Sequence, residues 1–250
     1  MMNHPYQDIP ISLPDFFSWE SSRAIPVEEC GEPIVSASYV PEKILVSPQY
    51  FIHGINGAVA DCFVRRSVLL RLIEAADMLP EGLRLLLLDG WRHRMVQTSL
   101  FQKFRSELRA KMPLLSDREI TDLASQFVAP PSVAATHPSP HTTGGAVDVT
   151  IVDGTGLCLP MGTEFDETTE RSATDYYEKK VIAREKLSEE EGEFLLNRRL
   201  LYAVMTRAGF TNYPDEWWHY DYGNQNWALL RGERAALYGA SEPKFRWRLS

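Results

Sequence analysis

The chain has 250 residues, a length that suits one large domain or two small ones. Its 44% hydrophobic, 11% aromatic and 24% charged residues are typical of a globular protein, and no run of eighteen apolar residues could span a membrane. The formal net charge of −8 argues against a nucleic-acid partner, because binding to phosphates needs a basic face.

Two features of the sequence favour a cytoplasmic location. The first residues, 1–6, lack the basic region and the apolar core of a secretory signal. The cysteines Cys30, Cys62 and Cys158 are odd in number and widely spaced, which suits a reducing compartment better than a disulfide framework. Since no CxxC pair is present, a cysteine-based zinc site is not expected.

The first third of the chain predicts a loop-rich wrap, a helix and a buried strand. Residues 1–58 contain many Pro and Ser residues and no long helical period, so we expect extended segments and loops. Residues 61–79 carry apolar residues at helical spacing and stop at Pro80, which predicts a helix. Residues 83–88 (LRLLLL) form a short apolar run that predicts a buried strand.

Three further helices are predicted along the chain. One covers about residues 93–112, and the next begins at Ser116, whose side chain can form a capping box with Glu119. A similar capping signal begins a helix at Ser188 that runs to Arg207.

Two strand-like segments carry the residues that point to chemistry. Residues 129–145 are rich in Pro, Thr and Gly and predict a loop, which leads into a clear β pattern at 146–152 (AVDVTIV). The aromatic-rich residues 216–222 (EWWHYDY) also resemble a strand. With no internal repeat and no clear linker, the pattern predicts a single α+β domain.

The first candidate metal-binding motif lies at residues 139–148 (SPHTTGGAVD). His141 stands in a glycine-rich loop, and Asp148 follows seven residues later inside an apolar strand. A carboxylate buried among apolar side chains is unfavourable unless it is paired or binds a cation, and a metal would remove that penalty. Gly144 and Gly145 let the backbone turn tightly enough for the two side chains to converge.

The second candidate motif is Glu216-Trp217-Trp218-His219. His219 can offer a neutral imidazole nitrogen to zinc, and Glu216 can hold and deprotonate a water molecule on the metal. Three protein ligands and one water form the open arrangement of catalytic zinc, whereas a structural site is closed by four protein ligands. Because residues three apart point to opposite faces of a regular strand, we predict a turn or a distortion between Glu216 and His219.

Each of these residues also has an ordinary structural interpretation. His219 could be a hydrogen-bonded core histidine, Asp148 a strand-end cap and His141 a loop residue, so the residues alone leave a shared metal site and simple packing about equally favoured. His137 is predicted to be structural, since the intervening prolines prevent the helix that would make its spacing from His141 useful. The chain has no HExxH motif, which excludes the helix-borne zincin site.

Taken together, the motifs resemble those of zinc D-alanyl-D-alanine dipeptidases of the VanX type. The wider group also includes VanY-type carboxypeptidases. Four ordered segments carry the resemblance: 88–92 (LDGWR), 139–148, 161–166 (MGTEFD) and 216–219. It extends over about residues 30–230.

The resemblance implies an enzyme that uses one Zn²⁺ to hydrolyse D-Ala-D-Ala or a related dipeptide in the turnover of peptidoglycan precursors. The implied zinc ligands are His141, Asp148 and His219, with Glu216 as general base and Arg92 stabilising the developing oxyanion.

On this basis we predict one domain over residues 1–250. A loop-rich wrap at 1–58 would surround a catalytic core at 59–235. In that core, helices would flank a small antiparallel sheet that carries the zinc site.

The resemblance also implies residues that bind the substrate. A dipeptide is a zwitterion, so the site needs an acceptor for its ammonium group and donors for its carboxylate. Asp166 matches a family acid suited to the ammonium, Ser139 could bind the carboxylate, and Tyr39 is matched to a substrate-contacting tyrosine. Two alternatives remain open: a carboxypeptidase or endopeptidase of the same group that acts on longer muropeptides, and a zinc-binding module without catalysis.

Overall fold

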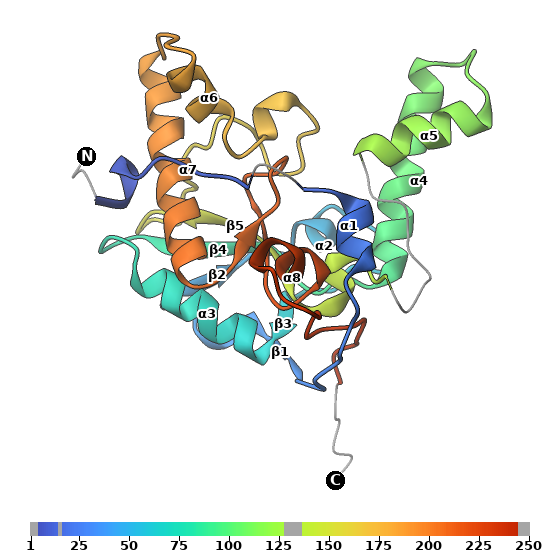
Figure 1. Ribbon diagram of the computed structural model, residues 1–250, viewed down its shortest axis with the longest axis horizontal. Helices are drawn as coiled ribbons and strands as arrows, with labels where there is room; N and C mark the ends of the chain where they lie inside the picture. The colour runs from blue at the N-terminus through green and yellow to red at the C-terminus, as the bar shows by residue number, and fades with distance from the viewer. Residues whose placement is uncertain (1–4, 15–16, 128–136, 245–250) are drawn as a thin grey trace.

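A five-stranded sheet forms the centre of the computed structural model, which describes residues 5–14, 17–127 and 137–244 (Figure 1). Its strand order is β2-β4-β5-β7-β6, where β2 and β4 pair parallel and the other neighbours pair antiparallel. The strands are β2 (Ile44–Val46), β4 (Arg84–Asp89), β5 (Ala146–Val152), β6 (Thr211–Asn212) and β7 (His219–Asp221). A separate antiparallel pair joins β1 (Ile34–Ser36) to β3 (Phe63–Arg65).

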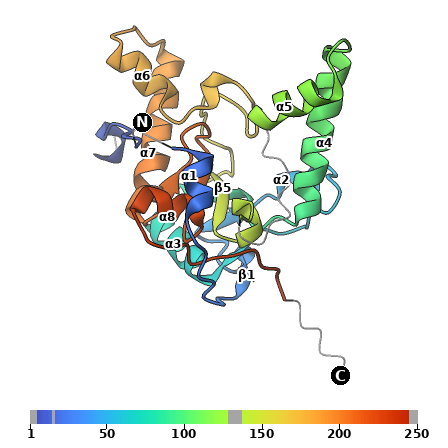
Figure 2. The same cartoon turned by 45° about the vertical axis from the view of Figure 1, so that its right-hand side comes forward.

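Helices surround this sheet, and two of them, α4 and α5, project from it as an arm (Figures 1 and 2). The α-helices are α1 (Trp19–Ala24), α2 (Gln49–Ile52), α3 (Arg66–Asp77), α4 (Arg94–Lys111), α5 (Asp117–Phe127), α6 (Tyr176–Ile182), α7 (Glu189–Arg207) and α8 (Gln225–Arg231). Short 3₁₀ helices are η1 (Pro5–Asp8), η2 (Ala37–Tyr39), η3 (Pro140–Thr143) and η4 (Glu170–Ser172). The prediction of an α+β fold is confirmed.

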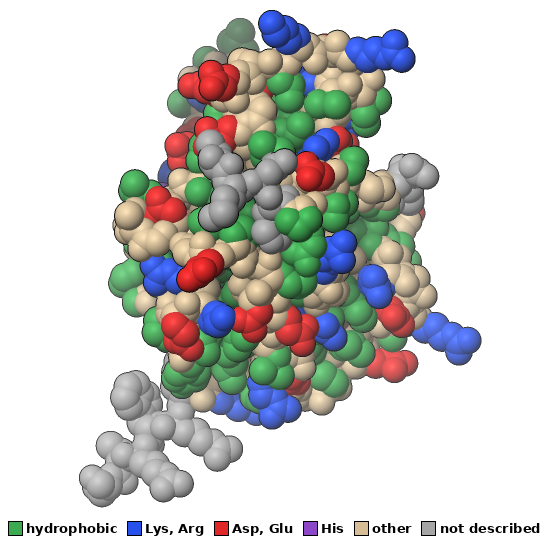
Figure 3. All heavy atoms as spheres, turned by 90° about the vertical axis from the view of Figure 1, so that its left-hand side faces the viewer, with side chains coloured by type: hydrophobic (Ala, Val, Ile, Leu, Met, Phe, Trp, Pro, Cys, Tyr) green, Lys and Arg blue, Asp and Glu red, His purple; other side chains and the backbone are tan. Residues whose placement is uncertain are grey.

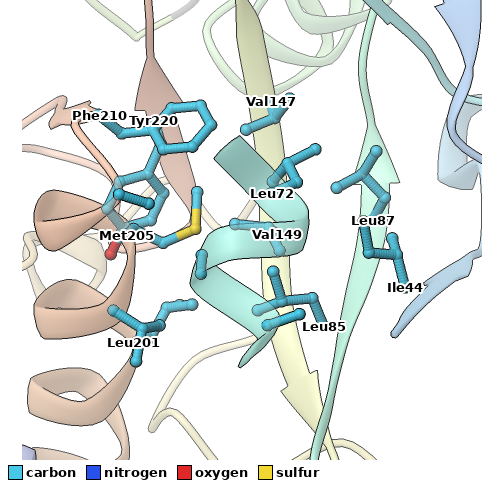
Figure 4. Close-up of a cluster of buried hydrophobic side chains, with 14 of the residues drawn as sticks. Ile44, Leu72, Leu85, Leu87, Val147, Val149, Leu201, Met205, Phe210 and Tyr220 are labelled. Atoms are coloured by element: carbon cyan, nitrogen blue, oxygen red, sulfur yellow. The ribbon is translucent and has the colours of Figure 1, made fainter. Parts of the chain in front are cut away.

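The main hydrophobic core lies where α3 and α7 cover one face of the sheet. In Figure 4, Leu72 of α3 and Leu201 of α7 lie among Val147 and Val149 of β5, and all four are fully buried. Each such side chain contributes roughly 1.5–3 kcal/mol when it is removed from water. Because side chains alternate along a strand, the residues between these core positions point to the opposite face of the sheet, where the candidate site lies.

Most of the predicted elements are present at the predicted positions. The apolar runs at 83–88 and 146–152 form β4 and β5, and the segment at 93–112 forms α4. Both capping boxes are formed as well. The backbone N–H of Ser116 donates to the Glu119 side chain, and the backbone N–H of Glu119 donates to the Ser116 hydroxyl. Ser188 and Glu191 form the same pair of hydrogen bonds at the start of α7.

Two predicted elements differ from the structure. The helix expected at 61–79 begins only at Arg66, because residues 63–65 pair with β1 as strand β3 and this pairing overrides the helical spacing. Of residues 216–222, only 219–221 form a strand. Part of the loop predicted at 129–145 lies outside the described residues.

The sheet is also larger than the small antiparallel one that we predicted. The strands that carry the candidate site, β5 and β7, are antiparallel as expected, while β2 makes the complete sheet mixed.

Charged side chains of both signs are interspersed over the face shown in Figure 3. Within the described parts of the chain, no helix has the length and apolar character needed to cross a membrane.

Candidate active site

Asp148 and His219 lie directly opposite each other on β5 and β7. Opposed residues of an antiparallel pair share one face of the sheet, with Cβ atoms about 4.5–5.5 Å apart. Here that face is the one opposite the α3–α7 core. His219 Nδ1 lies 3.1 Å from Asp148 Oδ1, and both side chains are buried. The sheet register therefore brings together two of the predicted metal ligands from distant parts of the sequence.

His141 reaches the same place from η3, just before β5. Two glycines make this approach possible: Gly144 ends η3 in the left-handed region (φ 72°), and a Cβ on Gly145 would lie only 2.5 Å from the carbonyl oxygen of Tyr222. His141 Nε2 lies 3.2 Å from His219 Nδ1 and 3.5 Å from Asp148 Oδ1. The structure thus brings all three predicted ligands together.

The three ligand atoms fit a zinc ion in size as well as in chemistry. His141 Nε2, His219 Nδ1 and Asp148 Oδ1 form a triangle with edges of 3.1, 3.2 and 3.5 Å. Zinc bonds of about 2.0–2.1 Å at tetrahedral angles place neighbouring ligand atoms about 3.3 Å apart. The triangle therefore has the dimensions of one face of a zinc tetrahedron, and its fourth corner points away from these three residues.

Hydrogen bonds on the far side of each imidazole leave the correct nitrogen for a metal. His141 Nδ1 lies 2.8 Å from the carbonyl oxygen of Gly90, to which it donates when Nε2 carries the lone pair. His219 Nε2 lies 3.2 Å from Asp221 Oδ1, which leaves Nδ1 toward Asp148. Metal-binding histidines are commonly oriented by such carbonyl and carboxylate acceptors.

The electrostatics of the site are those of a cation-binding group. Burial opposes the charged form of Asp148, yet the neighbouring His141 and His219 hold its pKa well below the usual range. Burial would lower the pKa of His219, but the carboxylates of Asp221 and Asp148 raise it well above its usual value. The negative charge gathered around two imidazoles is what a divalent ion would neutralise.

Glu216 reaches the site because the chain turns between it and His219. The backbone N–H of His219 donates to the carbonyl oxygen of Glu216 (3.2 Å), and the Asn212 side chain donates to the carbonyl oxygens of both residues (3.1 and 3.0 Å). Glu216 Oε2 then lies 3.7 Å from His219 Nδ1. This confirms the turn predicted between these two residues.

The surroundings of Glu216 suit proton transfer near neutral pH. Burial raises the pKa of Glu216 to about 7, and the carboxylates of Asp148 and Asp166 act in the same direction, against the effect of His219 and Arg92. The adjacent Trp217 and Trp218 are each 3% exposed and limit access of bulk water.

Arg92 is a buried cation just beyond the end of β4. Its Nε donates to Asp89 (2.8 Å), its Nη1 to Gln97 (2.8 Å), and its Nη2 lies 3.5 Å from Asp148 Oδ2. The guanidinium also lies 4.5 Å from the centre of the Tyr50 ring. Among the described residues these bonds use three of its five N–H groups, and Arg92 lines the cavity in front of the metal ligands.

A cavity of about 1030 Å³ opens in front of these side chains. The three candidate metal ligands, together with Glu216 and Arg92, contribute to its lining. The outer walls come from α1 and from one face of α4, whose contributing residues are Gln97, Leu100, Lys103, Phe104 and Glu107. A long and partly charged cleft therefore adjoins the metal-binding group.

Of the three predicted substrate-binding residues, the structure brings Asp166 and Ser139 to the cavity. Asp166 lies in the left-handed backbone region (φ 65°), which is uncommon for a residue other than glycine. Its side chain is accessible from the cavity, yet the surrounding protein displaces enough water to raise the pKa of Asp166 to about 6.

The structure does not bring Tyr39, the third predicted substrate-binding residue, to the cavity. Its side chain is 76% exposed at the end of η2. That turn is fixed by bonds from Ser36 and Ser38 to Asp61, which hold it on the surface. Tyr50 lies on the cavity wall instead.

Sequence reasoning missed four residues that complete the site. Two had a detectable signal: Asp221 is two residues from His219 and so shares its face of the strand, and Asp89 belongs to the same LDGWR segment as Arg92. Asn212 and Tyr50 had none, because their contacts depend on tertiary packing.

Comparisons with known proteins identify the family of the chain. The D-ala-D-ala dipeptidase family (Peptidase M15) matches residues 52–233. A D-alanyl-D-alanine dipeptidase of Synechocystis sp. is 31% identical over 237 aligned residues, covering 88% of this chain and 96% of that protein. The D-alanyl-D-alanine dipeptidase of Escherichia coli is 28% identical over 163 residues, covering 65% and 67%. Among solved structures, the D,D-pentapeptidase VanY in complex with Zn(II) aligns with a TM-score of 0.39 and 17% identity, covering 86% of this chain and 96% of that one.

Proposed function

We propose that this chain, which belongs to the D-ala-D-ala dipeptidase family of M15 peptidases, hydrolyses D-Ala-D-Ala or a closely related dipeptide. The chain is a metallopeptidase, and zinc is its metal. The observation that carries the proposal is the zinc-sized triangle of His141, Asp148 and His219 with Glu216 beside it. A purely structural zinc site has no need of an adjacent base.

The ligands in this proposal are His141 Nε2, His219 Nδ1 and an oxygen of Asp148. Zinc bound there supplies Lewis acidity, which polarises a carbonyl group and makes water acidic enough to attack near neutral pH. Glu216 takes the proton of the attacking water. Since its pKa is raised to about 7, Glu216 can hold that proton and then deliver it to the leaving amine.

Arg92 and Asp166 complete the proposed mechanism. Arg92 donates N–H groups to the substrate oxygen on which negative charge develops, and its bonds to Asp89 and Gln97 hold the guanidinium in place beforehand. Asp166 accepts the ammonium group of the dipeptide, and Ser139 donates to its carboxylate. This arrangement selects a substrate whose free amine lies one residue from the scissile bond.

Hydrolysis of D-Ala-D-Ala with and without a chelator, followed by addition of zinc, tests the proposal. Glu216→Ala should retain about one equivalent of zinc and lose turnover by about 10²–10⁴-fold, because it removes only the base. Glu233→Gln, an exposed carboxylate substitution away from the cavity, is the matched control. Full activity of Glu216→Ala would show that the base is assigned wrongly.

A second candidate is a carboxypeptidase or endopeptidase that acts on longer muropeptides. The cavity volume of about 1030 Å³ favours it, since pockets for drug-sized ligands typically measure about 300–1,000 Å³ and a dipeptide is a smaller ligand. Comparing D-Ala-D-Ala with its N-acetylated form separates the two. Equal cleavage of the blocked peptide would refute the dipeptidase proposal, because that peptide has no ammonium group for Asp166.

We extend the proposal to domain limits and location. Residues 59–235 form the catalytic core, and residues 1–58 wrap it and contribute Tyr50 to the cavity. A role in the turnover of peptidoglycan precursors in the cytoplasm is consistent with three cysteines that form no disulfide: Cys30, Cys62 and Cys158. Activity on D-Ala-D-Ala in a cytosolic fraction of the source cells would test the location.

A further inference from the structure

A buried chain of hydrogen bonds connects the N-terminal helix α1 to the proposed zinc ligand His219. The Ser22 hydroxyl donates to Asn226 Oδ1 (2.6 Å), and Asn226 Nδ2 donates to Asp221 Oδ2 (3.1 Å). Asp221 Oδ1 in turn lies 3.2 Å from His219 Nε2. Each of these four side chains is 6% exposed or less, so water does not compete for the bonds.

We propose that this chain fixes the tautomer and orientation of His219, and that Asp221, Asn226 and Ser22 are positioning residues for metal binding. The proposal rests on the proposed function in that His219 is taken as a zinc ligand. It extends the contact between Asp221 and His219 to Asn226 and Ser22, which lie behind the site, and assigns a role to the N-terminal segment.

The hydrogen bonds around Asp221 make both of its carboxyl oxygens acceptors. Its side chain faces the amide groups of Asn226 and Asn224 as well as His219. The Asn224 amide cannot rotate freely, because its Oδ1 accepts the N–H of Trp227 at the start of α8 (3.1 Å). The two Asn side chains thus donate to Asp221.

The same hydrogen bonds then orient His219. Its Nε2 faces the acceptor Asp221, so Nε2 carries a hydrogen and Nδ1, which faces Asp148 and His141, is the nitrogen available to a metal. Ser22 closes the other end of the chain: its hydroxyl occupies Asn226 Oδ1 and so keeps the Asn226 N–H group toward Asp221. The hydroxyl of Ser22 therefore acts on the metal site through two intervening side chains.

The position of α1 makes this connection specific. Figures 1 and 2 both show α1 beside α8, and Gln225 Nε2 donates to the carbonyl oxygen of Ile25 (2.6 Å) to hold the helix there. Trp19 and Arg23 of the same helix line the cavity. One short helix thus forms part of the substrate cavity while its Ser22 side chain supports the metal site.

Zinc affinity tests the inference directly, because it needs no catalysis. The zinc dissociation constant of the full chain is measured by competition with a chromophoric chelator. Asp221→Asn should raise it by about 10–100-fold, the usual effect of losing an acceptor behind a metal-binding histidine. Ser22→Ala should raise it by less, under about 10-fold. The matched control is Ser21→Ala, the same change one residue away on α1, whose side chain takes no part in the chain of bonds.

A spectroscopic readout separates positioning from general damage. In the Co²⁺-substituted protein, Asp221→Asn and Ser22→Ala should alter the visible absorption bands that report metal geometry, and Ser21→Ala should not. If Asp221→Asn fails to fold, Ser22→Ala decides the question. Unchanged zinc affinity and an unchanged Co²⁺ spectrum in Ser22→Ala and Asp221→Asn would overturn the inference and leave the proposed function intact. Normal zinc binding without hydrolysis of D-Ala-D-Ala would contradict the proposed function and leave this inference intact.

Discussion

Two carboxylic acids in the same cavity have raised pKa values, and their positions suit them to different tasks. Burial raises the pKa of Glu216 to about 7, and Glu216 Oε2 lies 3.7 Å from His219 Nδ1, the proposed ligand atom, so Glu216 suits proton transfer. The pKa of Asp166, raised to about 6 by the loss of surrounding water, still leaves that group ionised at pH 7. It suits the binding of an ammonium group.

The raised pKa of Asp166 predicts a pH dependence of substrate binding. Below about pH 6 the carboxyl group binds a proton and loses the charge that attracts the ammonium group, so KM for D-Ala-D-Ala should rise up to tenfold per pH unit. Asp166→Asn should lower kcat/KM by about 10–100-fold, the equivalent of a charge-assisted hydrogen bond of about 1.5–3 kcal/mol, and should remove this pH dependence of KM.

KM measured between about pH 4.5 and 8, with zinc occupancy checked at each point, tests the Asp166 prediction. Glu164→Gln is the matched control, since it removes an exposed carboxylate from the same segment outside the cavity lining. If Asp166→Asn keeps the acidic rise in KM, another group causes it.

Arg92 should be irreplaceable by lysine, although the charge is conserved. A lysine cannot form the fork that joins Asp89 and Gln97 while still donating into the cavity. Arg92→Lys is therefore expected to lower kcat by about 10²–10³-fold with zinc content unchanged. The control is Arg94→Lys, the same change at an exposed position two residues on. A loss in Arg92→Lys confined to KM would argue for a binding role in place of oxyanion stabilisation.

At the scale of elements, the sequence was most informative where local signals agree with the fold. The caps at Ser116 and Ser188 and the apolar run of β5 each predicted their element. Strand β3 was missed because its partner strand lies 27 to 31 residues earlier in the sequence: Ser36 pairs with Phe63, and Ile34 pairs with Arg65. A run of residues at helical spacing contains no local signal of such long-range pairing. The positions of Tyr39 on the surface and of Tyr50 beside Arg92 could not be predicted for the same reason, since only packing distinguishes the two residues.

The turn from η3 into β5 gives a prediction at this scale. A methyl group on Gly145 would lie 2.5 Å from the Tyr222 carbonyl oxygen, in a place where the two backbones also exchange a hydrogen bond of 2.7 Å. Gly145→Ala should therefore destabilise the fold by about 1–3 kcal/mol. It should also weaken zinc binding, because this turn brings His141 to Asp148.

Chemical denaturation in the presence of a chelator measures the stability effect of Gly145→Ala without a contribution from zinc. Gly192→Ala in α7 is the contrasting control: a methyl group there meets no atom within 4 Å, and alanine in a helix should stabilise by about 0.5–1 kcal/mol. Equal stability of the two variants would mean that the turn can open without penalty.

At the scale of the whole molecule, the metal site joins segments that are far apart in the sequence. Its three proposed ligands lie between residues 141 and 219, Arg92 follows β4, and the supporting chain begins at Ser22. No short piece of the chain contains the full set. Zinc should therefore bind the folded state far better than the unfolded state, and binding should stabilise the whole fold.

Removal of zinc should lower the melting temperature, and the difference should shrink at acidic pH. Saturation at 100 times the dissociation constant stabilises a fold by about 2.7 kcal/mol. Without metal, the carboxylates around His219 raise its pKa well above the usual value, so this ligand carries a proton that zinc must displace. The apparent zinc affinity should consequently increase with pH, by up to tenfold per unit for one displaced proton, until pH reaches the pKa of His219.

Thermal unfolding at several pH values, with and without a chelator, measures this zinc-dependent stabilisation. The control is His53→Ala, which removes an exposed histidine. A zinc-dependent stabilisation that is the same at every pH would contradict His219 as a ligand.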